Sequence, residues 1–185
     1  MGEEGIIYPA ISKTGIQIMS ANLLLQNEDD PIIWRGPMIG DLVKQFYTEV
    51  LWHNVDYMVI DMPPGTGDVA LTTFQYLPVD GIIIVTSPQD LVSTIVKKAI
   101  KMASEMNIPI LGLVENMSYV ECPTCKEKIY IYGKSHIDEV AKQFNLDILG
   151  KLPLREDISR LVDEGEVEDI ECSYLDEALI KIKSL

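Results

Sequence analysis

The sequence has 185 residues and a net charge of −14, from 29 acidic and 15 basic side chains. Hydrophobic residues make up 47% and charged residues 24%, a composition typical of one globular domain with a sizeable core. So negative a chain repels nucleic acid and anionic membranes, and we expect neither as a partner. No apolar signal segment opens the chain, and its apolar runs are too short to span a bilayer. Three cysteines, two of them close together, favour a reducing, cytoplasmic setting over a disulfide scaffold.

Apolar runs and helical patterns alternate along the chain. In chain order, residues 16–25 are a strand candidate, and the one-sided apolar spacing of residues 37–52 predicts a helix. Short runs rich in Ile, Leu and Val predict buried strands at residues 55–61, 81–87, 108–116 and 147–153. Further helices are predicted at residues 90–106, 135–144 and 174–183.

These runs are nearly continuous rather than alternating, which is typical of parallel strands covered on both faces. Strands that alternate with helices predict an α/β fold with a doubly wound, mostly parallel sheet. No linker or internal repeat interrupts the pattern, so we interpret residues 1–185 as a single domain.

A glycine-rich loop follows the run at residues 55–61, which ends at Asp61. A carboxylate at the end of a parallel strand can hold Mg²⁺ through water, and Gly65 and Gly67 allow backbone N–H groups to approach a phosphate. Asp68 can cap the helix that follows. The pattern fits a Pro-Gly turn, a Rossmann fingerprint ending at Ala70, or the Walker B and switch segment of a nucleotide hydrolase. Two prolines after Asp61 weaken the Rossmann interpretation.

Cys122-Pro-Thr-Cys125 precedes a stretch that is predicted to be extended, residues 126–132. This arrangement predicts a hairpin knuckle that directs two thiolates to one metal centre, whereas a redox-active pair would open a helix. Zinc or a [4Fe–4S] cluster requires about four ligands, so the simplest completion is a second copy of the chain. Residue types alone leave both metals open. Cys172 is interpreted as a bystander thiol, and His136, like the other histidine, as a surface residue.

Several motifs together resemble the Mrp/ApbC family, which is related to MinD among the deviant-Walker P-loop ATPases. The resemblance covers the chain from about residue 16 onward, in the family's order and spacing. It is carried by WRGPM at residues 34–38, DMPPGTGD at 61–68, ENMSY at 115–119, CPTC at 122–125, PL at 153–154 and DEG at 163–165.

The resemblance implies a homodimeric ATPase that holds a bridging [4Fe–4S] cluster and delivers it to client apoproteins. Asp61 would be the catalytic, magnesium-side residue, and Gly65, Thr66, Gly67 and Asp68 would sense the γ-phosphate of ATP. At the adenine end, the resemblance implies Asn116 and Pro153. Asn116 is also explained by a simple turn at the end of a strand. Cys122 and Cys125 would be the cluster ligands.

The family's P-loop, a Gly-Lys-Gly-Gly-Val-Gly-Lys-Ser segment, is not found in these 185 residues. The only Gly-Lys-Ser, residues 133–135, has Lys128 where the first P-loop glycine should stand, and we interpret it as a helix start. Four phosphate hydrogen bonds are worth about 6–12 kcal/mol, while a micromolar site has about 8 kcal/mol in total. The resemblance therefore implies an N-terminally truncated P-loop NTPase domain, of the MinD-like type, that neither binds ATP tightly nor hydrolyses it alone. We also expect uncovered strand edges.

Two other functions compete with an iron–sulfur carrier. The first is a non-catalytic zinc-knuckle interaction module on a degenerate NTPase scaffold. The second is a MinD-like positioning ATPase, which is disfavoured because the last predicted helix carries both acids and lysines instead of a basic membrane-binding face.

Overall fold

A computed structural model describes residues 6–25, 27, 36–133 and 135–185 of the chain. The chain forms two compact units, Met1–Pro78 and Val79–Leu185, which are considered separately below. The interpretation of residues 1–185 as one domain stays a prediction. Within the described part of the chain, no helix has the length and apolar character that crossing a membrane requires.

The larger unit is built on a three-stranded parallel sheet with the order β3-β4-β7. The strands are β3 (Ile82–Thr86), β4 (Ile110–Glu115) and β7 (Ile148–Lys151). Leu113 of β4 pairs with Ile84 of β3 and with Ile148 of β7, and it is fully buried. The structure therefore confirms the strands predicted at residues 81–87, 108–116 and 147–153, and it confirms their parallel arrangement.

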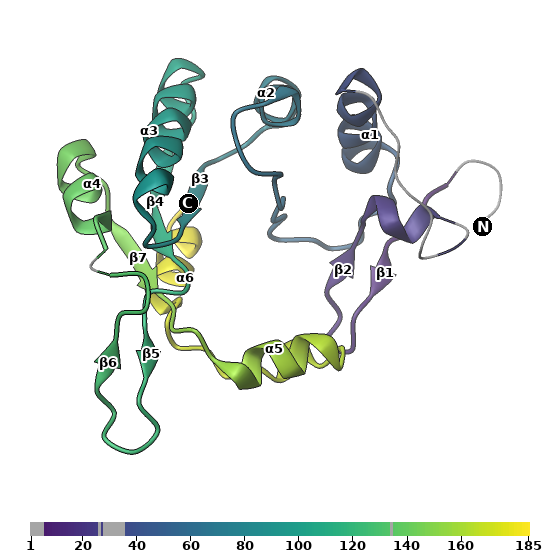
Figure 1. The fold of residues 1–185 in the computed structure, drawn as a ribbon. Coiled ribbons are helices and arrows are strands. Elements are labelled where there is room, and N and C mark those ends of the chain that lie inside the picture. The colour runs from purple at the N-terminus through teal and green to yellow at the C-terminus, as the bar shows by residue number, and fades with distance from the viewer. Residues whose placement is uncertain (1–5, 26, 28–35, 134) are drawn as a thin grey trace. The chain divides into compact units, whose positions relative to one another are not determined.

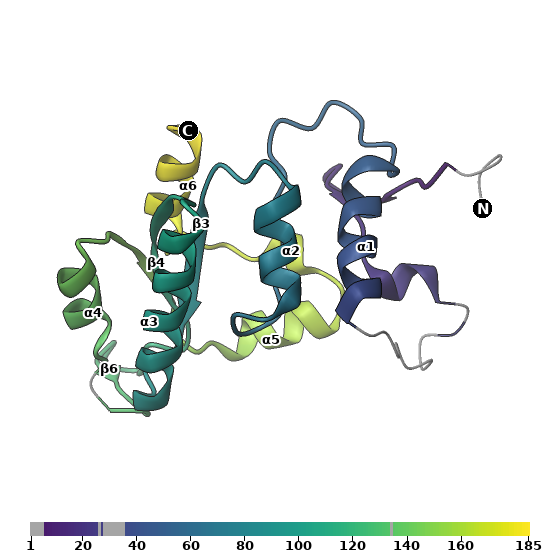
Figure 2. The same ribbon diagram turned by 90° about the horizontal axis from the view of Figure 1, so that it is seen from above.

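Helices cover both faces of this sheet (Figures 1 and 2). On one face, α3 (Asp90–Glu105) and α4 (Ile137–Phe144) pack through Val96, Ile100 and Val140 against Ile84 and Leu113. On the other face, α6 (Asp176–Lys183) contributes Ala178 to a second cluster with residues of β4 and β7. A sheet covered on both faces explains why its strands are apolar throughout, and all three predicted helices are confirmed.

Between β4 and α4 the chain forms a small antiparallel hairpin, which projects away from the sheet (Figure 1). Its strands are β5 (Val120–Glu121) and β6 (Lys128–Ile129), so the predicted hairpin knuckle is confirmed. After β7 the chain forms α5 (Glu156–Asp163) and a short 3₁₀ helix, η2 (Val167–Asp169). The 3₁₀ helix lies in an acidic stretch, residues 164–171, that follows α5.

The smaller unit begins with the antiparallel strands β1 (Ala10–Ile11) and β2 (Gln17–Ile18), followed by the 3₁₀ helix η1 (Ala21–Leu24). The strand predicted at residues 16–25 is thus reduced to two residues. Helices α1 (Gly36–Thr48) and α2 (Asp68–Tyr76) lie side by side in both views (Figures 1 and 2). At their contact, a Cβ on Gly40 would lie 3.1 Å from Thr72 Oγ1, so glycine permits the close approach. The helix predicted at residues 37–52 is confirmed but ends at Thr48.

The strand predicted at residues 55–61 is wrong. In the structure this segment has no regular secondary structure, and its apolar side chains are exposed, with Val59 at 85%. A strand is stable only when a neighbouring strand accepts and donates its backbone hydrogen bonds. No strand pairs with this segment among the described residues, so its apolar composition alone does not make it a strand. The segment exposes apolar side chains, but it is not a strand edge, and the expected uncovered strand edges stay a prediction.

Leu113 offers a direct test of the core. Truncation of Leu113→Ala leaves a cavity between the sheet and its helices, and we expect the free energy of unfolding to fall by about 2–5 kcal/mol. Leu179→Ala is a matched control, because the side chain of Leu179 in α6 is half exposed. We expect the control to lose less than about 1 kcal/mol. Urea denaturation followed by circular dichroism measures both, and equal losses would contradict this assignment of the core.

Candidate functional site

The cysteine pair lies at the tip of the β5–β6 hairpin. The backbone N–H of Cys122 donates to the carbonyl of Glu127 at 2.9 Å, and the N–H of Lys126 donates to the carbonyl of Cys122 at 2.9 Å. Lys126 has a positive φ of 62°, which closes the turn after Cys125. Cys122 is half-buried, Cys125 is exposed, and both are free thiols. Local backbone hydrogen bonds therefore fix a tight knuckle that presents both sulfur atoms near its surface.

The turn also changes the acidity of Cys122. Hydrogen bonds from the backbone N–H groups of Cys125 and Thr124, in that order, stabilise its thiolate, with a smaller effect from the side chain of Cys125. The positive charge of Lys126 adds the smallest contribution. Together they lower the pKa of the Cys122 thiol below its ordinary value. Because the thiolate is the form that binds metal, protons compete less well for this ligand than for an ordinary cysteine.

An aromatic cluster supports the base of the hairpin. Tyr119 and Tyr130 meet edge to face with ring centroids 6.4 Å apart, and Lys128 Nζ lies 4.2 Å from the centroid of Tyr119. Tyr119 is buried, whereas β6 and the residues after it keep large side chains in solvent. The exposed side chains are Ile129, Tyr130, Ile131 and Tyr132. The base of the hairpin thus combines a buried aromatic contact with exposed apolar side chains, and Ile129 pairs with Val120 there.

The predicted adenine residues Asn116 and Pro153 follow two adjacent strands of the sheet, β4 and β7. The N–H of Asn116 donates to the carbonyl of Thr86 at 2.8 Å, which extends the ladder one residue beyond β4. Its side-chain oxygen accepts from the N–H of Met117 at 2.9 Å, in a turn where Met117 has a positive φ of 57°. The side chain of Asn116 therefore stabilises this turn in the structure, as the simpler interpretation of this residue requires. The adenine role stays a prediction.

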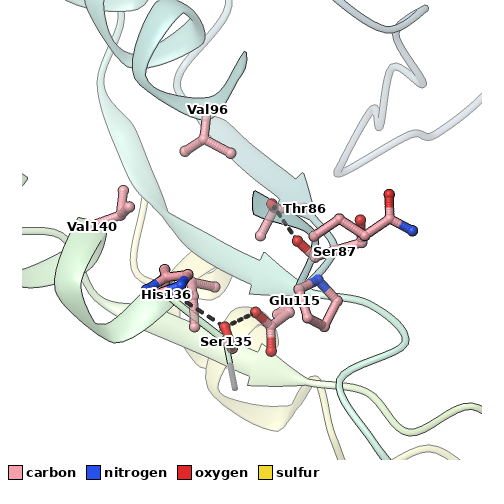
Figure 3. Close-up of a pocket in the computed structure, with 10 residues that line it drawn as sticks. Thr86, Ser87, Val96, Glu115, Ser135, His136 and Val140 are labelled. Carbon is pink, nitrogen blue, oxygen red and sulfur yellow. Dashed lines mark hydrogen bonds between the residues drawn. The ribbon is translucent and has the colours of Figure 1, made fainter. Parts of the chain in front are cut away.

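Glu115, the last residue of β4, was not singled out by sequence reasoning. It is only 1% exposed, and one of its carboxylate oxygens accepts from the hydroxyl of Ser118. The other oxygen accepts from the hydroxyl of Ser135 (Figure 3). Beside it lies a small pocket with about 20 Å³ of free volume, about enough for one water molecule. The pocket is lined by Thr86, Ser87, Pro88, Gln89, Val96, Glu115, Ser135, His136, Ile137 and Val140. A carboxylate at the end of an apolar strand was the signal that could have revealed it.

The predicted phosphate loop belongs to the smaller unit. Asp61, Gly65, Thr66 and Gly67 are exposed in an irregular segment, and Gly65 has a positive φ of 95°. The prediction that Asp68 caps the following helix is wrong. Gly67 occupies that position, and Asp68 is the first residue of α2, where its charge favours the positive end of the helix dipole. The structure thus shifts this prediction by one residue.

The predicted site residues divide between the two units. Asp61, Gly65, Thr66, Gly67 and Asp68 lie in Met1–Pro78, and Asn116, Cys122, Cys125 and Pro153 lie in Val79–Leu185. Trp34, Arg35 and Lys134 lie outside the described residues. Within the described ranges, no three His, Cys, Asp or Glu side chains gather closely enough to hold a metal ion. The cysteine pair of one chain therefore offers at most two thiolates to a metal centre, fewer than the about four ligands that zinc or a [4Fe–4S] cluster requires.

Comparison with known proteins identifies the family. The ParA family model described as NUBPL iron-transfer P-loop NTPase matches residues 1–184. The chain belongs to this family, which confirms the resemblance in the motifs. A solved nucleotide-binding protein from Archaeoglobus fulgidus, in complex with ADP, has a TM-score of 0.79 and 35% sequence identity. The alignment covers 93% of this chain and 66% of that one, and it confirms the α/β fold of P-loop NTPase type.

Two curated relatives carry names that describe their function. The iron-sulfur cluster carrier protein of Clostridium perfringens is 41% identical over 168 residues, which is 91% of this chain and 59% of the relative. The iron-sulfur cluster transfer protein NUBPL of Dictyostelium discoideum is 43% identical over 152 residues, covering 82% of this chain and 47% of the relative. The chain thus spans about half the length of the curated relatives that it matches.

The lowered pKa of Cys122 predicts a pH profile for alkylation. At neutral pH the thiolate fraction of Cys122 should exceed that of an ordinary cysteine, so iodoacetamide should modify it faster. The midpoint of rate against pH should lie lower in the folded protein than in urea, where the turn is lost. Mass spectrometry of the labelled peptide measures this midpoint. Lys126→Ala should shift it little, because the lysine contributes least, and equal folded and unfolded midpoints would contradict the proposed cause.

Proposed function

We propose that this protein is an iron–sulfur cluster carrier of the cytoplasm. Its cargo is a [4Fe–4S] cluster bound by Cys122 and Cys125 from each of two copies of the chain, and client apoproteins receive it. The observation that carries the proposal is the projecting hairpin, which presents two free thiols, one with a lowered pKa, at its tip. The names of the relatives support the same cargo.

The number of ligands supports a shared centre. A [4Fe–4S] cluster has four iron atoms, each with one position for a protein ligand, and thiolates are the usual donors. One chain offers a single pair at the hairpin tip, and two chains related by a two-fold axis offer two pairs. The exposed apolar side chains of residues 129–132 belong to the same hairpin and follow Cys125 by four to seven residues, and they provide surface that a second copy can cover.

Nucleotide binding is the second part of the proposal. Asp61 would hold Mg²⁺, the loop from Gly65 to Asp68 would contact the γ-phosphate of ATP, and Asn116 and Pro153 would face the adenine. The bound nucleotide would supply phosphoryl-transfer chemistry, with Asp61 as the magnesium-side catalytic residue. The donor types fit, since carboxylates suit Mg²⁺ and glycine-rich backbone suits phosphate. In a site that also contains the family's P-loop, ATP binding would regulate loading and release of the cluster.

Anaerobic loading with ferrous iron and sulfide tests the cargo. We expect a brown dimer with about four iron and four sulfide per two chains, the stoichiometry of one shared [4Fe–4S] cluster. Cys122→Ser/Cys125→Ser should lose nearly all the iron, whereas Cys172→Ser should retain it. The measurements are iron and sulfide assays together with size-exclusion chromatography and light scattering. A colourless, zinc-loaded protein under the same treatment would favour a zinc-knuckle module instead.

ATP binding by the 185-residue polypeptide provides a separate measurement. Without the phosphate contacts of a P-loop, we expect a Kd far weaker than micromolar, because about 6–12 kcal/mol of hydrogen bonding is missing. Isothermal titration calorimetry with MgATP, and phosphate release, measure binding and hydrolysis. Magnesium-dependent hydrolysis that Asp61→Asn abolished would contradict this expectation and would assign a complete catalytic site to this polypeptide.

A further inference from the structure

We propose that Glu115 is a positioning residue that fixes the cysteine hairpin to the sheet at both of its feet. The feet are Ser118, where the chain leaves the sheet, and Ser135, where it returns. This inference rests on the proposed cluster-binding function of Cys122 and Cys125. It assigns to Glu115, which touches neither cysteine, control over how the pair is presented to a second copy.

The contacts of Glu115 join segments that are far apart in sequence. Ser118 Oγ donates to Glu115 Oε2 at 2.5 Å, and Ser135 Oγ donates to Glu115 Oε1 (Figure 3). Ser135 Oγ in turn accepts from the N–H of Ile137 at 3.0 Å, in the first turn of α4. That bond leaves the hydroxyl proton of Ser135 directed at the carboxylate. One buried side chain therefore holds the end of β4, the outgoing foot, the returning foot and the start of α4.

In the part of the chain that the structure describes, backbone hydrogen bonds attach the outgoing foot to the segment after β7. The N–H of Ser118 donates to the carbonyl of Leu152 at 2.9 Å, and the N–H of Leu154 donates to the carbonyl of Tyr119 at 2.7 Å. These bonds attach the outgoing chain to the segment after β7. At the returning foot, the bond from Ser135 to Glu115 is the side-chain contact that links the chain back to β4. Losing it should free the returning foot while the outgoing foot stays in place.

Because Glu115 is buried, its carboxylate depends on hydrogen-bond donors from the protein. Glu115 is 1% exposed and Ser118 is 3% exposed, so bulk solvent has little access to the carboxylate or to the Ser118 hydroxyl, and the pocket lined by Glu115 and Ser135 has room for about one water molecule. A buried carboxylate that loses a donor is destabilised, and hydrogen bonds to charged groups are stronger than neutral ones. The tip of the hairpin, by contrast, is closed by its own bonds between Cys122, Lys126 and Glu127. The hydrogen-bonded group of Glu115, Ser118 and Ser135, called the clamp below, therefore sets the orientation of the tip and not the spacing of the two sulfur atoms.

The main test compares Ser135→Ala with Ser104→Ala, a control at an exposed position near the end of α3. Each protein is loaded with ferrous iron and sulfide, and a chelator then withdraws the iron while the visible absorption is followed. Ser135→Ala should release iron about tenfold faster than wild type, the consequence of losing one charge-assisted hydrogen bond from the docked hairpin. Ser104→Ala should match wild type. Equal release rates for Ser135→Ala and wild type would overturn the proposal.

A dithiol reagent separates positioning from damage to the hairpin. Phenylarsine oxide binds two neighbouring thiols of one chain, so its stoichiometry and affinity report on the tip alone. Both should be unchanged in Ser135→Ala, and weaker arsenical binding would mean that the substitution merely unfolds the hairpin, which would also overturn the proposal. Glu115→Gln keeps the shape and one acceptor oxygen, and its release rate should fall between those of wild type and Glu115→Ala.

Amide hydrogen exchange on the metal-free chain decides the clamp even if no iron is bound. Failure of wild type to hold iron and sulfide would remove the proposed function. In Glu115→Gln, which keeps Ser135 Oγ as the acceptor for the N–H of Ile137, exchange should quicken severalfold at residues 135–137, where the hydroxyl links residue 115 to α4, and should stay unchanged at Cys122 and Lys126. Unchanged exchange at residues 135–137 would overturn the clamp in either case.

Discussion

The buried central strand β4 is the constraint on which the larger unit depends. It has parallel neighbours on both sides, helices on both faces, and a residue, Leu113, with no exposed surface. Parallel strands deliver their carboxyl ends to one edge of a sheet, where ligands of α/β proteins bind. From that edge β4 continues directly into Asn116, the clamp residue Ser118 and the cysteine hairpin. The position of β4 therefore determines where the chain enters the cysteine hairpin.

Much of this unit could be predicted from the sequence because its signals are local. Strands β3, β4 and β7 are buried on two faces, so their apolar composition reports their environment directly. The same signal failed at residues 55–61, where the composition is that of a buried strand and Val59 is 85% exposed. Burial of such a run requires a neighbouring strand, and hydrogen-bond partners are a property of the assembled sheet, not of the segment. The apolar composition of residues 55–61 favours a buried strand, but no strand among the described residues pairs with this segment.

The candidate site shows the same division. Cys122 and Cys125 could be predicted because a knuckle is built from bonds within a few residues and because thiol chemistry is specific. For Glu115 the sequence offered only its position at the end of an apolar strand, because its partner Ser135 is 20 residues further along the chain. Asp68 was misplaced by one residue because Gly67 and Asp68 are both acceptable at a helix start, and backbone dihedral angles decide between them.

The hairpin is ordered in two ways: its tip has a fixed local conformation, and its base is attached to the sheet. The proposed shared cluster would need both. Backbone bonds at the tip keep the two thiols on one tight turn, and we expect that alone to let one chain bind a small arsenical. Bridging two chains also requires each hairpin to keep its direction, because freedom that must be lost on docking lowers affinity. A short hairpin on a flexible base would lose that freedom only when the cluster bound. In the proposed carrier, the buried carboxylate at the base would remove that freedom in advance, so Glu115 would contribute to an affinity that the cysteines alone do not determine.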